Sequence, residues 1–528
     1  MTKPFDGAGL RALVIGRRPY DLLTNLLLPH GNSMVRMWQA ARMKSTFIML
    51  IGTVIIGAAD PAPANLNSAS LVGCTGGLMP TLDQLAHDAV SEDKTTAANA
   101  ISALRTRGPE GLRALFIAHA DALKQHSAAN TLIAAKPPDD SWVRLKAALD
   151  AVGQQHDCYA SQLYWYTDLD QAKVAARESR KPILSLRLLG RLDEEFSCAN
   201  SRFFRTTLYA NSGVAQFLRN NFVLHWKSVR PVPRITIDFG DGRKIERTIT
   251  GNSIHYVLDS DGRVIDALPG LYGPREFMNG LTLANYAANQ AGMLSGAERD
   301  GFLTEFHRDR IAAVSTQWAD DIDQIGGHTP PLRKALRFEP YSELPPSAVL
   351  ACSITLTKAG VERPFWYAMT PRADADRAKL ESTTDDDMWA KIAALPAHTV
   401  YLDAGSRELI RAKNPSALAA GRVAVSKSIV ETPLVRTIQN LQRSIAEDTV
   451  RNEYLLHTKI HEWLANGSAP ADADPLNAKA YAELFLTPDS DPWLGLVPRD
   501  TFTALENDGL VQPTGKLPNA QVSARPSF

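Results

Sequence analysis

Cysteine is scarce in this sequence: 528 residues contain four, at positions 74, 158, 198 and 352. Four cysteines in a chain of this length do not form a stapling framework, and their spacing does not choose among the three complete pairings. The sequence also contains no Cys-x-x-Cys, no Cys-x-x-Cys-His and no clustered pattern of cysteine and histidine. We therefore expect neither haem attachment nor a cysteine-based structural zinc site.

An excess of charge of either sign is also missing. The chain has 57 basic and 57 acidic residues, and lysine and arginine do not gather in a run. Because backbone binding to nucleic acid needs a positive field, we expect no nucleic-acid partner. The sequence lacks a glycine-rich phosphate loop and a Gly-x-Ser-x-Gly motif, so it offers no anchor for nucleotide binding or for a serine hydrolase.

Long apolar runs are absent too. The stretch Phe47–Ile56 is well short of the ~20 residues that cross a bilayer. Lys44 precedes this stretch and an Ala-x-Ala ending at Ala64 follows it, which is the pattern of a signal peptide. We therefore predict a signal peptide starting at Met43 and a periplasmic or secreted bacterial protein, with no membrane contact beyond that segment.

Two alternatives to a cleaved signal peptide stay open. The same stretch is compatible with a short N-terminal membrane anchor. The letters "LVGC" ending at Cys74 have the form of a lipid-attachment signal, although they lie more than ten residues beyond the apolar stretch. A signal peptide normally begins at the first methionine, so Met43 is the expected start and residues 1–42 an over-extended translation.

The composition indicates a large globular protein. The chain is 45% hydrophobic and 22% charged, which is enough for a sizeable core, and its length favours about three domains. Apolar residues three and four apart predict helices over about 80–152. The expected organisation is a targeting region at 1–64, a helical region at 65–155, an α/β domain at 156–290, and a mainly helical region with some strands at 291–528.

From residue 160 onward, short apolar runs typical of strands alternate with segments typical of helices. Short apolar runs predict strands at 162–167, 182–190 and 222–229, and two hairpins are expected, around Asp241-Gly242 and around residues 259–262. A helix follows the first strand, with Thr167 and Asp170 in capping-box spacing, and another begins at Pro274. The predicted order is β-α-β-α-β followed by β-β-α.

The C-terminal half gives fewer signals. Three apolar segments, 348–356, 364–370 and 398–403, are strand candidates, and residues 432–467 read as one long helix. In that helix Thr432 is the expected cap, Pro433 the first residue and Gly467 the end. No function follows from this half of the sequence.

Three segments within 160–285 carry a family resemblance: "DLDQAKVAARESRKPIL" (168–184), "NSGVAQFLRNNFVLHW" (211–226) and "YVLDSDGRVIDALPGLYGPREFMNGL" (256–281). In order and wording they resemble the exported thioredoxin-like domains of thiol–disulfide interchange proteins. The resemblance implies an α/β thioredoxin-like domain, a central mixed sheet flanked by helices, within a multidomain α+β chain. It assigns Cys198 to the first redox-cysteine position and Ser201 to the second, and we expect no cofactor.

The resemblance gives a Cys-x-x-Ser in place of a Cys-x-x-Cys. A helix N-terminus stabilises a thiolate, and Ser201 can donate a hydrogen bond to the sulfur of Cys198 but cannot resolve a mixed disulfide. Such a site is monothiol, like the Cys-x-x-Ser sites of monothiol glutaredoxins. Its sulfur can form a mixed disulfide or a sulfenic acid.

Other departures from the family pattern argue against dithiol chemistry. The acidic residues 193–195 precede Cys198, and their charge disfavours a thiolate. Ser197 stands where the family usually has tryptophan, and Ser253 where it has the cis-proline that faces the substrate, so we expect a trans peptide bond at Ser253. The strand at 183–189 lacks the buried acid of some members. A packed, unreactive Cys198 is the favoured interpretation.

Two other arrangements would involve Cys198. A Cys158–Cys198 disulfide is one, although Cys158 is expected at the opposite end of the strands. His225 and His255 could join Cys198 in a soft metal site, but histidines satisfied within the sheet are favoured. No metal site is assigned there.

One helical segment places three possible ligands on one face. Glu453, His457 and His461 follow each other at i, i+4 spacing, which can present metal ligands on one side of a helix. The order differs from His-Glu-x-x-His, and a solvated face or a partly buried contact beside Tyr454 is the favoured interpretation, so we assign no metal here.

These observations lead to one functional prediction and two alternatives. We expect an exported thioredoxin-like protein without dithiol redox activity, acting through an unknown protein partner in an interaction or scaffold role rather than as an enzyme. The alternative is a monothiol redox or thiol-binding protein acting through Cys198, with Ser253 on the loop that faces the substrate. Metal handling is a more distant alternative.

Overall fold

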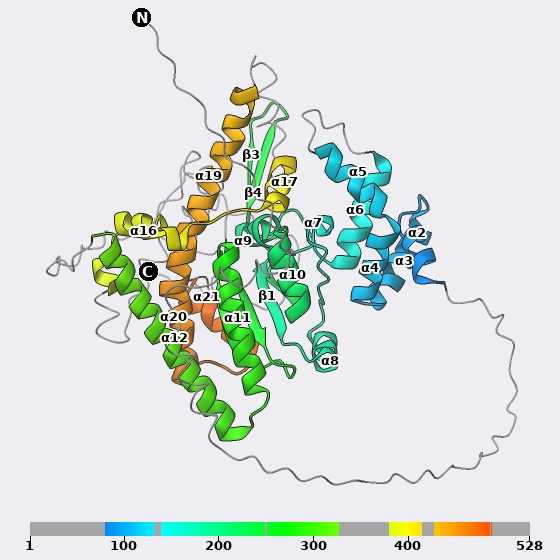
Figure 1. Cartoon of the computed structure of the whole chain (residues 1–528). Helices are drawn as coiled ribbons and strands as arrows, with labels where there is room; N and C mark the ends of the chain where they lie inside the picture. Colours follow the sequence, from blue (N-terminus) through cyan, green and yellow to red (C-terminus); the bar gives the residue numbers. More distant parts are fainter. Residues whose placement is uncertain are drawn as a thin grey trace, which may run out of the picture. The chain divides into compact units, whose positions relative to one another are not determined.

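The computed structural model describes residues 80–130, 139–248, 251–326, 380–413, 427–485 and 487. The predicted signal peptide, Cys74 and the two strand candidates at 348–356 and 364–370 lie outside these residues. Within them, no helix is both long enough and apolar enough to cross a membrane. The chain is a mixed α/β protein with a four-stranded mixed sheet and many helices (Figure 1).

The N-terminal part of the described chain is helical, as predicted. Its helices are α2 (Leu82–Asp88), α3 (Lys94–Thr106), α4 (Pro109–Ala118), α5 (Ala120–Asn130) and α6 (Asp140–Gly153). Side chains of Thr81, Asp93 and Asp139 cap three of them by accepting backbone N–H groups. Before α4, Gly108 adopts a φ of 64°, which favours glycine, and Pro109 opens the helix.

These helices share a hydrophobic core of their own. Leu104, Leu115, Leu149 and Val152 are among its fully buried members. Cys158 belongs to the same core, so the first described cysteine serves as an apolar side chain.

The next segment contains the elements that form the sheet. They are α7 (Cys158–Ser161), α8 (Leu169–Ser179), β1 (Ile183–Leu189), α9 (Ala199–Phe203), the π-helical turn η1 (Phe204–Leu208), α10 (Ser212–Asn221), β2 (Val223–Arg230), β3 (Arg234–Asp238), β4 (Lys244–Thr248), β5 (Ser253–Leu258), β6 (Val264–Pro269) and α11 (Pro274–Ala291). The apolar runs at 182–190 and 222–229 are therefore strands, both predicted hairpins are present, and a helix begins at Pro274 as expected.

Two local predictions in this segment are wrong. Residues 162–167 do not form a strand, and only a parallel bridge joins Tyr166 to His225 of β2. The cap of α8 is Asp168 instead of Thr167, because the Asp168 carboxylate accepts the backbone N–H groups of Asp170 and Gln171 at 2.8 and 3.2 Å.

The sheet has the strand order β2-β1-β5-β6. Strands β1 and β2 are parallel, and β5 runs antiparallel to both of its neighbours. The hairpin β3-β4 forms a separate two-stranded sheet, and it stands between β2 and β5 in the sequence. Every residue of β1 is buried, which explains why its sequence is continuously apolar apart from a serine and an arginine.

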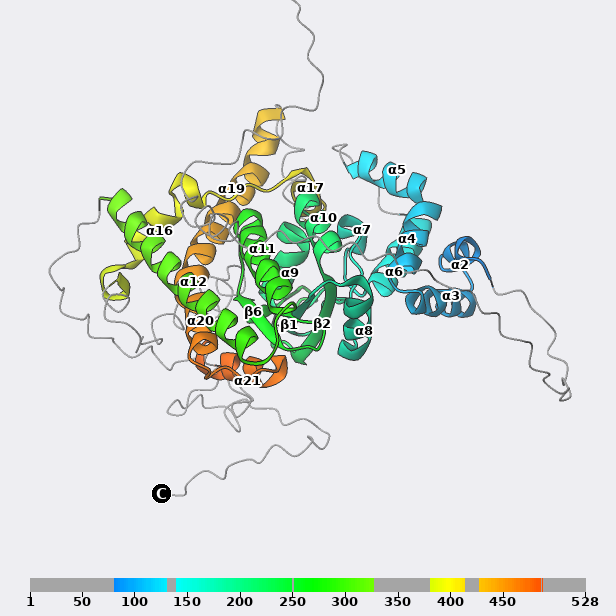
Figure 2. The same ribbon diagram turned by 60° about the horizontal axis from the view of Figure 1, so that its bottom comes forward.

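The register divides the sheet into two covered faces. Side chains alternate along a strand, so Leu186 and its partner His255 point to one face, while Ser185 and Tyr256 point to the other. The first face meets α11, because the rings of His255 and Phe277 lie 4.9 Å apart. The second face meets α21 (Ala473–Glu483), and Figure 2 shows strands between α11 and α21.

Helix α21 reaches this second face from the far end of the described chain. Arg187 of β1, 1% exposed, donates two hydrogen bonds of 3.0 and 2.9 Å to Asp474. The Tyr256 hydroxyl of β5 donates to the Asn477 side chain at 3.3 Å. Sheet and C-terminal helix are therefore joined by polar contacts as well as by the core.

The remaining elements are helical. They are α12 (Gly296–Gln324), α16 (Asp386–Ala393), the 3-10 turn η2 (Pro396–His398), α17 (Ala404–Lys413), α19 (Lys427–Arg451), the π-helical turn η4 (Asn452–His457), α20 (Thr458–Ala465) and α21. Residues 399–403 form no strand, so the strand prediction at 398–403 is wrong. The predicted long helix is divided into α19, η4 and α20. It begins at Lys427, five residues before the predicted cap Thr432, and Gly467 lies two residues past the end of α20 with a φ of 71°.

One continuous core joins the sheet to these helices. It includes Leu186 and Ile254 of the strands, Trp318 of α12, Trp463 of α20 and Leu476 of α21. The helices after residue 291 therefore bury apolar surface together with the sheet. The predicted division at residue 290 stays a prediction, since no feature of the described chain tests it.

Candidate functional site

Cys198 lies just beyond the end of β1. Its backbone N–H donates to the Leu189 carbonyl at 3.0 Å, and Cys198 is the N-cap residue of α9. Ser253 is the residue of β5 that pairs with Leu188, one position before Leu189. The structure thus brings Cys198 and Ser253 to the same end of β1.

The thiol of Cys198 is enclosed. The residue is 0% exposed, as are Ser201 and Ser253. The Sγ atom of Cys198 accepts the backbone N–H of Ser201 at 3.5 Å and donates to the Ser201 hydroxyl oxygen at 3.4 Å. The Ser201 hydroxyl in turn donates to the carbonyl of Cys198 at 2.9 Å. This closed pair caps the first turn of α9 and leaves no exposed sulfur.

Ser253 makes no hydrogen bond through its hydroxyl group within the described residues. It lies in a strand instead of an open loop, and no described peptide bond is cis, so the expected trans bond is present. Ser253 is therefore adjacent to the cysteine end of β1 but is not available to solvent.

The acidic residues before Cys198 are engaged with cations. Glu195 lies 2.7 Å from Nε2 of His156 and 3.1 Å from Nζ of Lys413. The hydrogen bond from His156 outweighs the effect of burial and lowers the pKa of Glu195 below its usual range. Asp193 pairs with Arg191. The expected crowding of the sulfur by free carboxylates is therefore relieved by these ion pairs.

The soft metal site of Cys198, His225 and His255 is excluded by the register. His225 pairs with Ser185 and His255 with Leu186, so the two imidazoles point to opposite faces of the sheet. His225 lies 2.7 Å from the Ser185 hydroxyl and His255 lies 2.7 Å from the Tyr209 hydroxyl. Both histidines are satisfied within the sheet, as favoured.

The Cys158–Cys198 disulfide is not formed, because both cysteines are free thiols. Cys158 lies in the core of the N-terminal helices, where its Sγ donates to the Leu163 carbonyl at 3.5 Å. Burial raises the pKa of the Cys158 thiol well above its ordinary value. Cys158 is therefore an inert structural residue.

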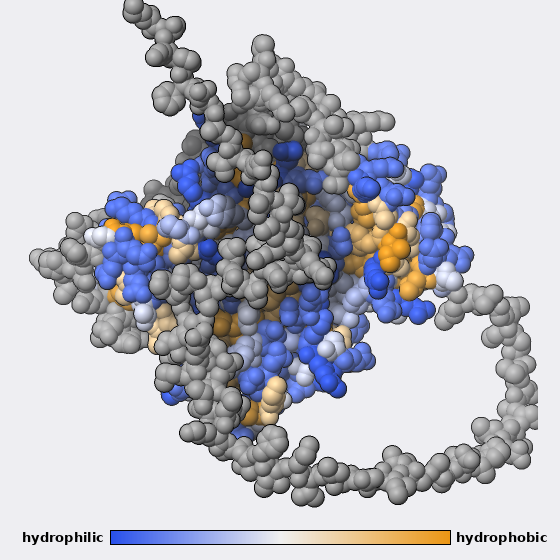
Figure 3. All heavy atoms as spheres, viewed as in Figure 1, coloured by the Kyte–Doolittle hydropathy of each residue, from blue (hydrophilic) through white to orange (hydrophobic). Residues whose placement is uncertain are grey.

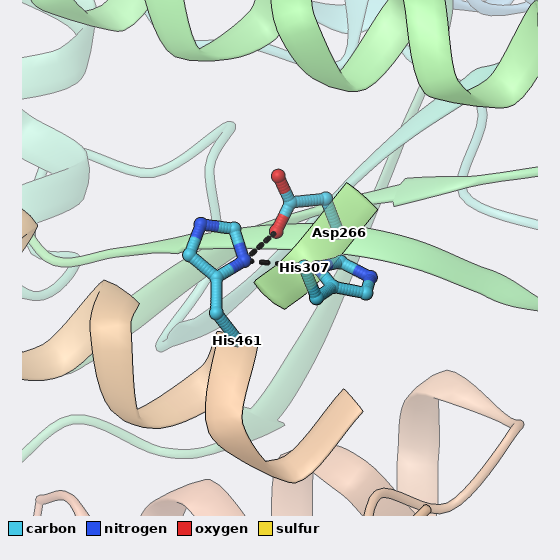
Figure 4. Close-up of side chains that lie close together, drawn as sticks. All are labelled: Asp266, His307 and His461. Atoms are coloured by element: carbon cyan, nitrogen blue, oxygen red, sulfur yellow. Dashed lines mark hydrogen bonds and ion pairs between the residues drawn. The ribbon is translucent and has the colours of Figure 1, made fainter. Parts of the chain in front are cut away.

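A second cluster of titratable groups lies where β6, α12 and the π-turn η4 with α20 meet (Figure 4). Asp266 comes from β6, His307 from α12, and His461 from α20. Nδ1 of His461 is 2.9 Å from Nδ1 of His307 and 3.6 Å from Oδ1 of Asp266. All three side chains are at most 2% exposed.

Two further residues of the cluster were predicted from spacing. His457 donates from Nε2 to Oδ1 of Asp266 at 3.1 Å, and its Nδ1 is 2.8 Å from Glu453. Arg310 of α12 reaches Glu453 at 3.2 Å. Glu453, His457 and His461 thus do lie together, and the solvated-face interpretation is wrong because both histidines are buried.

The charges of the cluster follow from its geometry. Burial lowers the pKa of His457, but Glu453 and Asp266 outweigh burial and raise it to about 10. Burial alone would raise the pKa of Asp266, yet His461 and His457 hold it below its usual range. Burial lowers the pKa of His461 and of His307, so both imidazoles are neutral. The cluster therefore holds a charged His457 between two carboxylates, beside two neutral imidazoles.

A third group, His156, Asp157 and Glu195, also places three possible ligand atoms together. Here ammonium groups already occupy the space: Lys413 lies 2.8 Å from Asp157, and Lys146 lies 3.2 Å from it. This group is an ion-pair network that ties α17 to the segment before α7.

The chain matches no known protein-family profile, no curated protein and no solved structure. Its function must therefore be argued from its own residues.

Asp266 and His307 were not singled out from the sequence. Asp266 carried a signal, since a carboxylate in the middle of the buried run "VIDALP" needs a partner. His307 carried none, because one histidine in a charged helix is ordinary. Its role depends on the packing of α12 against α20.

Proposed function

We propose that the chain is an exported thioredoxin-like protein that has no dithiol redox activity and acts by binding another protein. The observation that carries this proposal is the complete burial of Cys198 together with a serine at position 201. Thiol exchange requires a thiolate that a partner sulfur can reach. A sealed thiol with a serine at the second position, and with no bond to the other cysteine of the described residues, serves packing and helix capping.

The arrangement of elements supports the thioredoxin-like assignment. A β1-helix-β2 unit is followed by the β5-β6 hairpin and α11 on one mixed sheet, which is the order that the sequence resemblance implies. Cys198 caps the helix that follows β1, as the resemblance requires. A single parallel bridge joins Tyr166 to β2, within the segment for which the first strand was predicted.

Exposed apolar side chains support a role in binding a protein. Ile117 of α4 and Val143 of α6 are 65% and 52% exposed. Figure 3 shows an apolar area over the N-terminal helices, bordered by hydrophilic residues. Apolar area with a polar rim is typical of a protein-binding surface.

Thiol labelling tests the first half of the proposal. Full-length protein is treated with a maleimide from pH 6 to pH 9, and the labelled cysteines are identified by peptide mass spectrometry. We expect Cys198 to react only after unfolding in urea. Rapid labelling of Cys198 in the folded protein near neutral pH, lost in Cys198→Ala, would overturn the proposal in favour of a monothiol protein.

Surface variants test the second half of the proposal, that the chain binds another protein. A partner that copurifies with the full chain should be lost with Ile117→Glu and retained with Tyr286→Glu, which changes an apolar side chain of α11 that is 54% exposed. Equal retention in both variants would show that the apolar area is not the binding surface.

The monothiol alternative has one specific observation in its favour. Asn200, two residues after Cys198, is fully buried, and both polar atoms of its amide lack hydrogen-bond partners within the described residues. A buried amide of this kind can donate to an oxidised sulfur. With hydrogen peroxide as oxidant, the thiolate would gain one oxygen to give a sulfenic acid, and hydroxide would leave. A dimedone adduct at Cys198 in folded protein would support this alternative.

Export is part of the proposal and has its own test. The pattern at Met43–Ala64 predicts removal of the N-terminal segment. N-terminal sequencing of protein from the periplasm or medium should begin after Ala64. An intact N-terminus in the cytoplasm would contradict export.

A further inference from the structure

Asp266, His307 and His461 converge from three elements that are far apart in the sequence. Figure 4 shows one carboxylate oxygen and the Nδ1 atom of His461 facing each other, with His307 beside them. The three ligand atoms all lie within 4.8 Å of one another. The site is closed to solvent, since none of the three residues is more than 2% exposed.

The spacing of the atoms fits a metal ion. Around a tetrahedral zinc ion with metal–ligand distances of ~2.0–2.1 Å, neighbouring ligand atoms lie about 3.3 Å apart. The two separations at His461, 2.9 Å to His307 and 3.6 Å to Asp266, lie on either side of that value. The third separation, between His307 and Asp266, is at most 4.8 Å, so an ion among the three atoms would draw these two side chains together.

The chemistry of the donors agrees with the spacing. Imidazole binds a metal through the lone pair of one ring nitrogen, and Nδ1 of His461 lies within reach of both other side chains. Two imidazoles with one carboxylate suit a divalent first-row transition metal, whereas magnesium and calcium prefer oxygen ligands alone.

We propose that Asp266, His307 and His461 bind a divalent transition-metal ion, zinc in the first place, which joins β6 to α12 and α20. Three protein ligands leave a fourth position on the ion for a small molecule such as water. Because the site is enclosed, the ion has a structural role. It would fasten the edge strand of the sheet to the C-terminal helices.

The surroundings hold the carboxylate in place. Oδ1 of Asp266 accepts the backbone N–H of Ala267 at 2.8 Å and Nε2–H of His457 at 3.1 Å. Glu453 fixes His457 through its other nitrogen, and Arg310 fixes Glu453. Metal sites typically have such a second layer of hydrogen bonds that orients the ligands. His457 and Glu453 are positioning residues in this arrangement.

Metal binding is tested on the full chain without an affinity tag. Elemental analysis of the purified protein should show close to one transition-metal ion per chain, and chelator-treated protein should recover one zinc ion in a titration against a colorimetric competitor. Added zinc should also raise the thermal midpoint of the chelated protein, since a ligand that binds only the folded state stabilises it. Bound iron or manganese in place of zinc would support the metal site and change the proposed identity of the ion.

Variants link the ion to these residues. Asp266→Asn and His461→Gln should lower zinc affinity about tenfold or more. The matched control is His398→Gln, because His398 is also a buried histidine paired with a carboxylate, Asp321, at 2.5 Å. The control should lose stability and keep its zinc.

Two results would overturn the proposal. One is a folded wild-type chain that holds no metal and whose midpoint does not change with micromolar zinc. The other is a loss of zinc in His398→Gln equal to that in the ligand variants. The wild-type measurement decides the question even if the ligand variants fail to fold. The cluster would then be a hydrogen-bonded polar core.

Discussion

At the scale of single residues, the Sγ atom of Cys198 lies where solvent does not reach it, and Ser201 occupies its hydrogen-bonding positions. The sequence placed this pair correctly at a helix start after a buried strand, because local spacing decides where helices begin. A packed Cys198 was the favoured interpretation, and the residue is fully buried. The sequence could not name the residues that enclose it, because they are brought there by long-range packing.

A cysteine at position 201 tests whether the missing second sulfur or the burial of Cys198 is the main reason that we expect no dithiol activity. We expect Ser201→Cys to remain inactive in insulin reduction with dithiothreitol, because both thiols would be buried. Labelling after unfolding in urea should show one additional thiol, which controls for correct replacement. Turnover above the dithiothreitol background would mean that the missing sulfur was the main loss.

The buried histidines of the sheet give a pH dependence. Burial lowers the pKa of His225 and of His255 to about 3, below the ordinary value of ~6.5. Each group therefore contributes stability that is present above pH ~6.5 and is lost as pH falls toward 3, by at most ~1.4 kcal/mol per pH unit.

Urea unfolding at pH 7, 6 and 5 measures this effect. His255→Leu should reduce the loss of stability on acidification, because one titrating group is removed. Tyr209→Phe is the matched variant, since it removes the hydrogen bond to His255 but keeps the imidazole. An unchanged pH slope in His255→Leu would contradict the expectation.

At the scale of elements, the strands and most helices were predictable. A fully buried strand such as β1 has a continuous apolar run, and hairpins carry Asp and Gly at their turns. The strand prediction at 398–403 was wrong because His398 ends the 3-10 turn η2 and residues 399–403 pair with no strand. Pairing depends on a neighbour that local sequence does not specify.

The identity of the residue that caps α8 can be tested by mutation. Asp168→Ala should lower the free energy of unfolding by about 1 kcal/mol, because two backbone N–H groups lose their acceptor. Thr167→Ala, the predicted cap, should have little effect. Chemical denaturation of both variants measures the difference in stability. A larger loss in Thr167→Ala than in Asp168→Ala would support the predicted capping box.

At the scale of the whole molecule, the sheet depends on a helix from the end of the described chain. Arg187 is buried, and its charge is balanced by Asp474 of α21. We expect Asp474→Ala to lower the free energy of unfolding by about 2 kcal/mol, less than the ~3–5 of a fully buried pair because Asp474 is half exposed.

The comparison variant for Asp474→Ala is Lys227→Ala. Lys227 pairs with the same carboxylate at 2.6 Å, but both side chains of that pair are about half exposed. Its loss should therefore cost less than ~1 kcal/mol. Equal costs in thermal or urea unfolding would mean that the burial of Arg187 has no energetic consequence.

The predicted boundary at residue 290 gives a test of the molecule as a whole. A fragment of residues 156–290 lacks α12, α20 and α21, which share its core. We expect it to show no cooperative thermal transition by circular dichroism, in contrast to the full chain. A sharp transition in the fragment would support an independent domain there. Sequence periodicity is local, so it could not have indicated the shared core.

The position of α21 has a consequence for the order of synthesis. Ribosomes complete β6 about 200 residues before α21. During that interval α21 does not yet cover one face of the sheet, and the guanidinium of Arg187 lacks its partner Asp474. A nascent chain in this condition is exposed to aggregation, so an unfolded state kept by chaperones until synthesis ends would suit both its folding and the export that we propose.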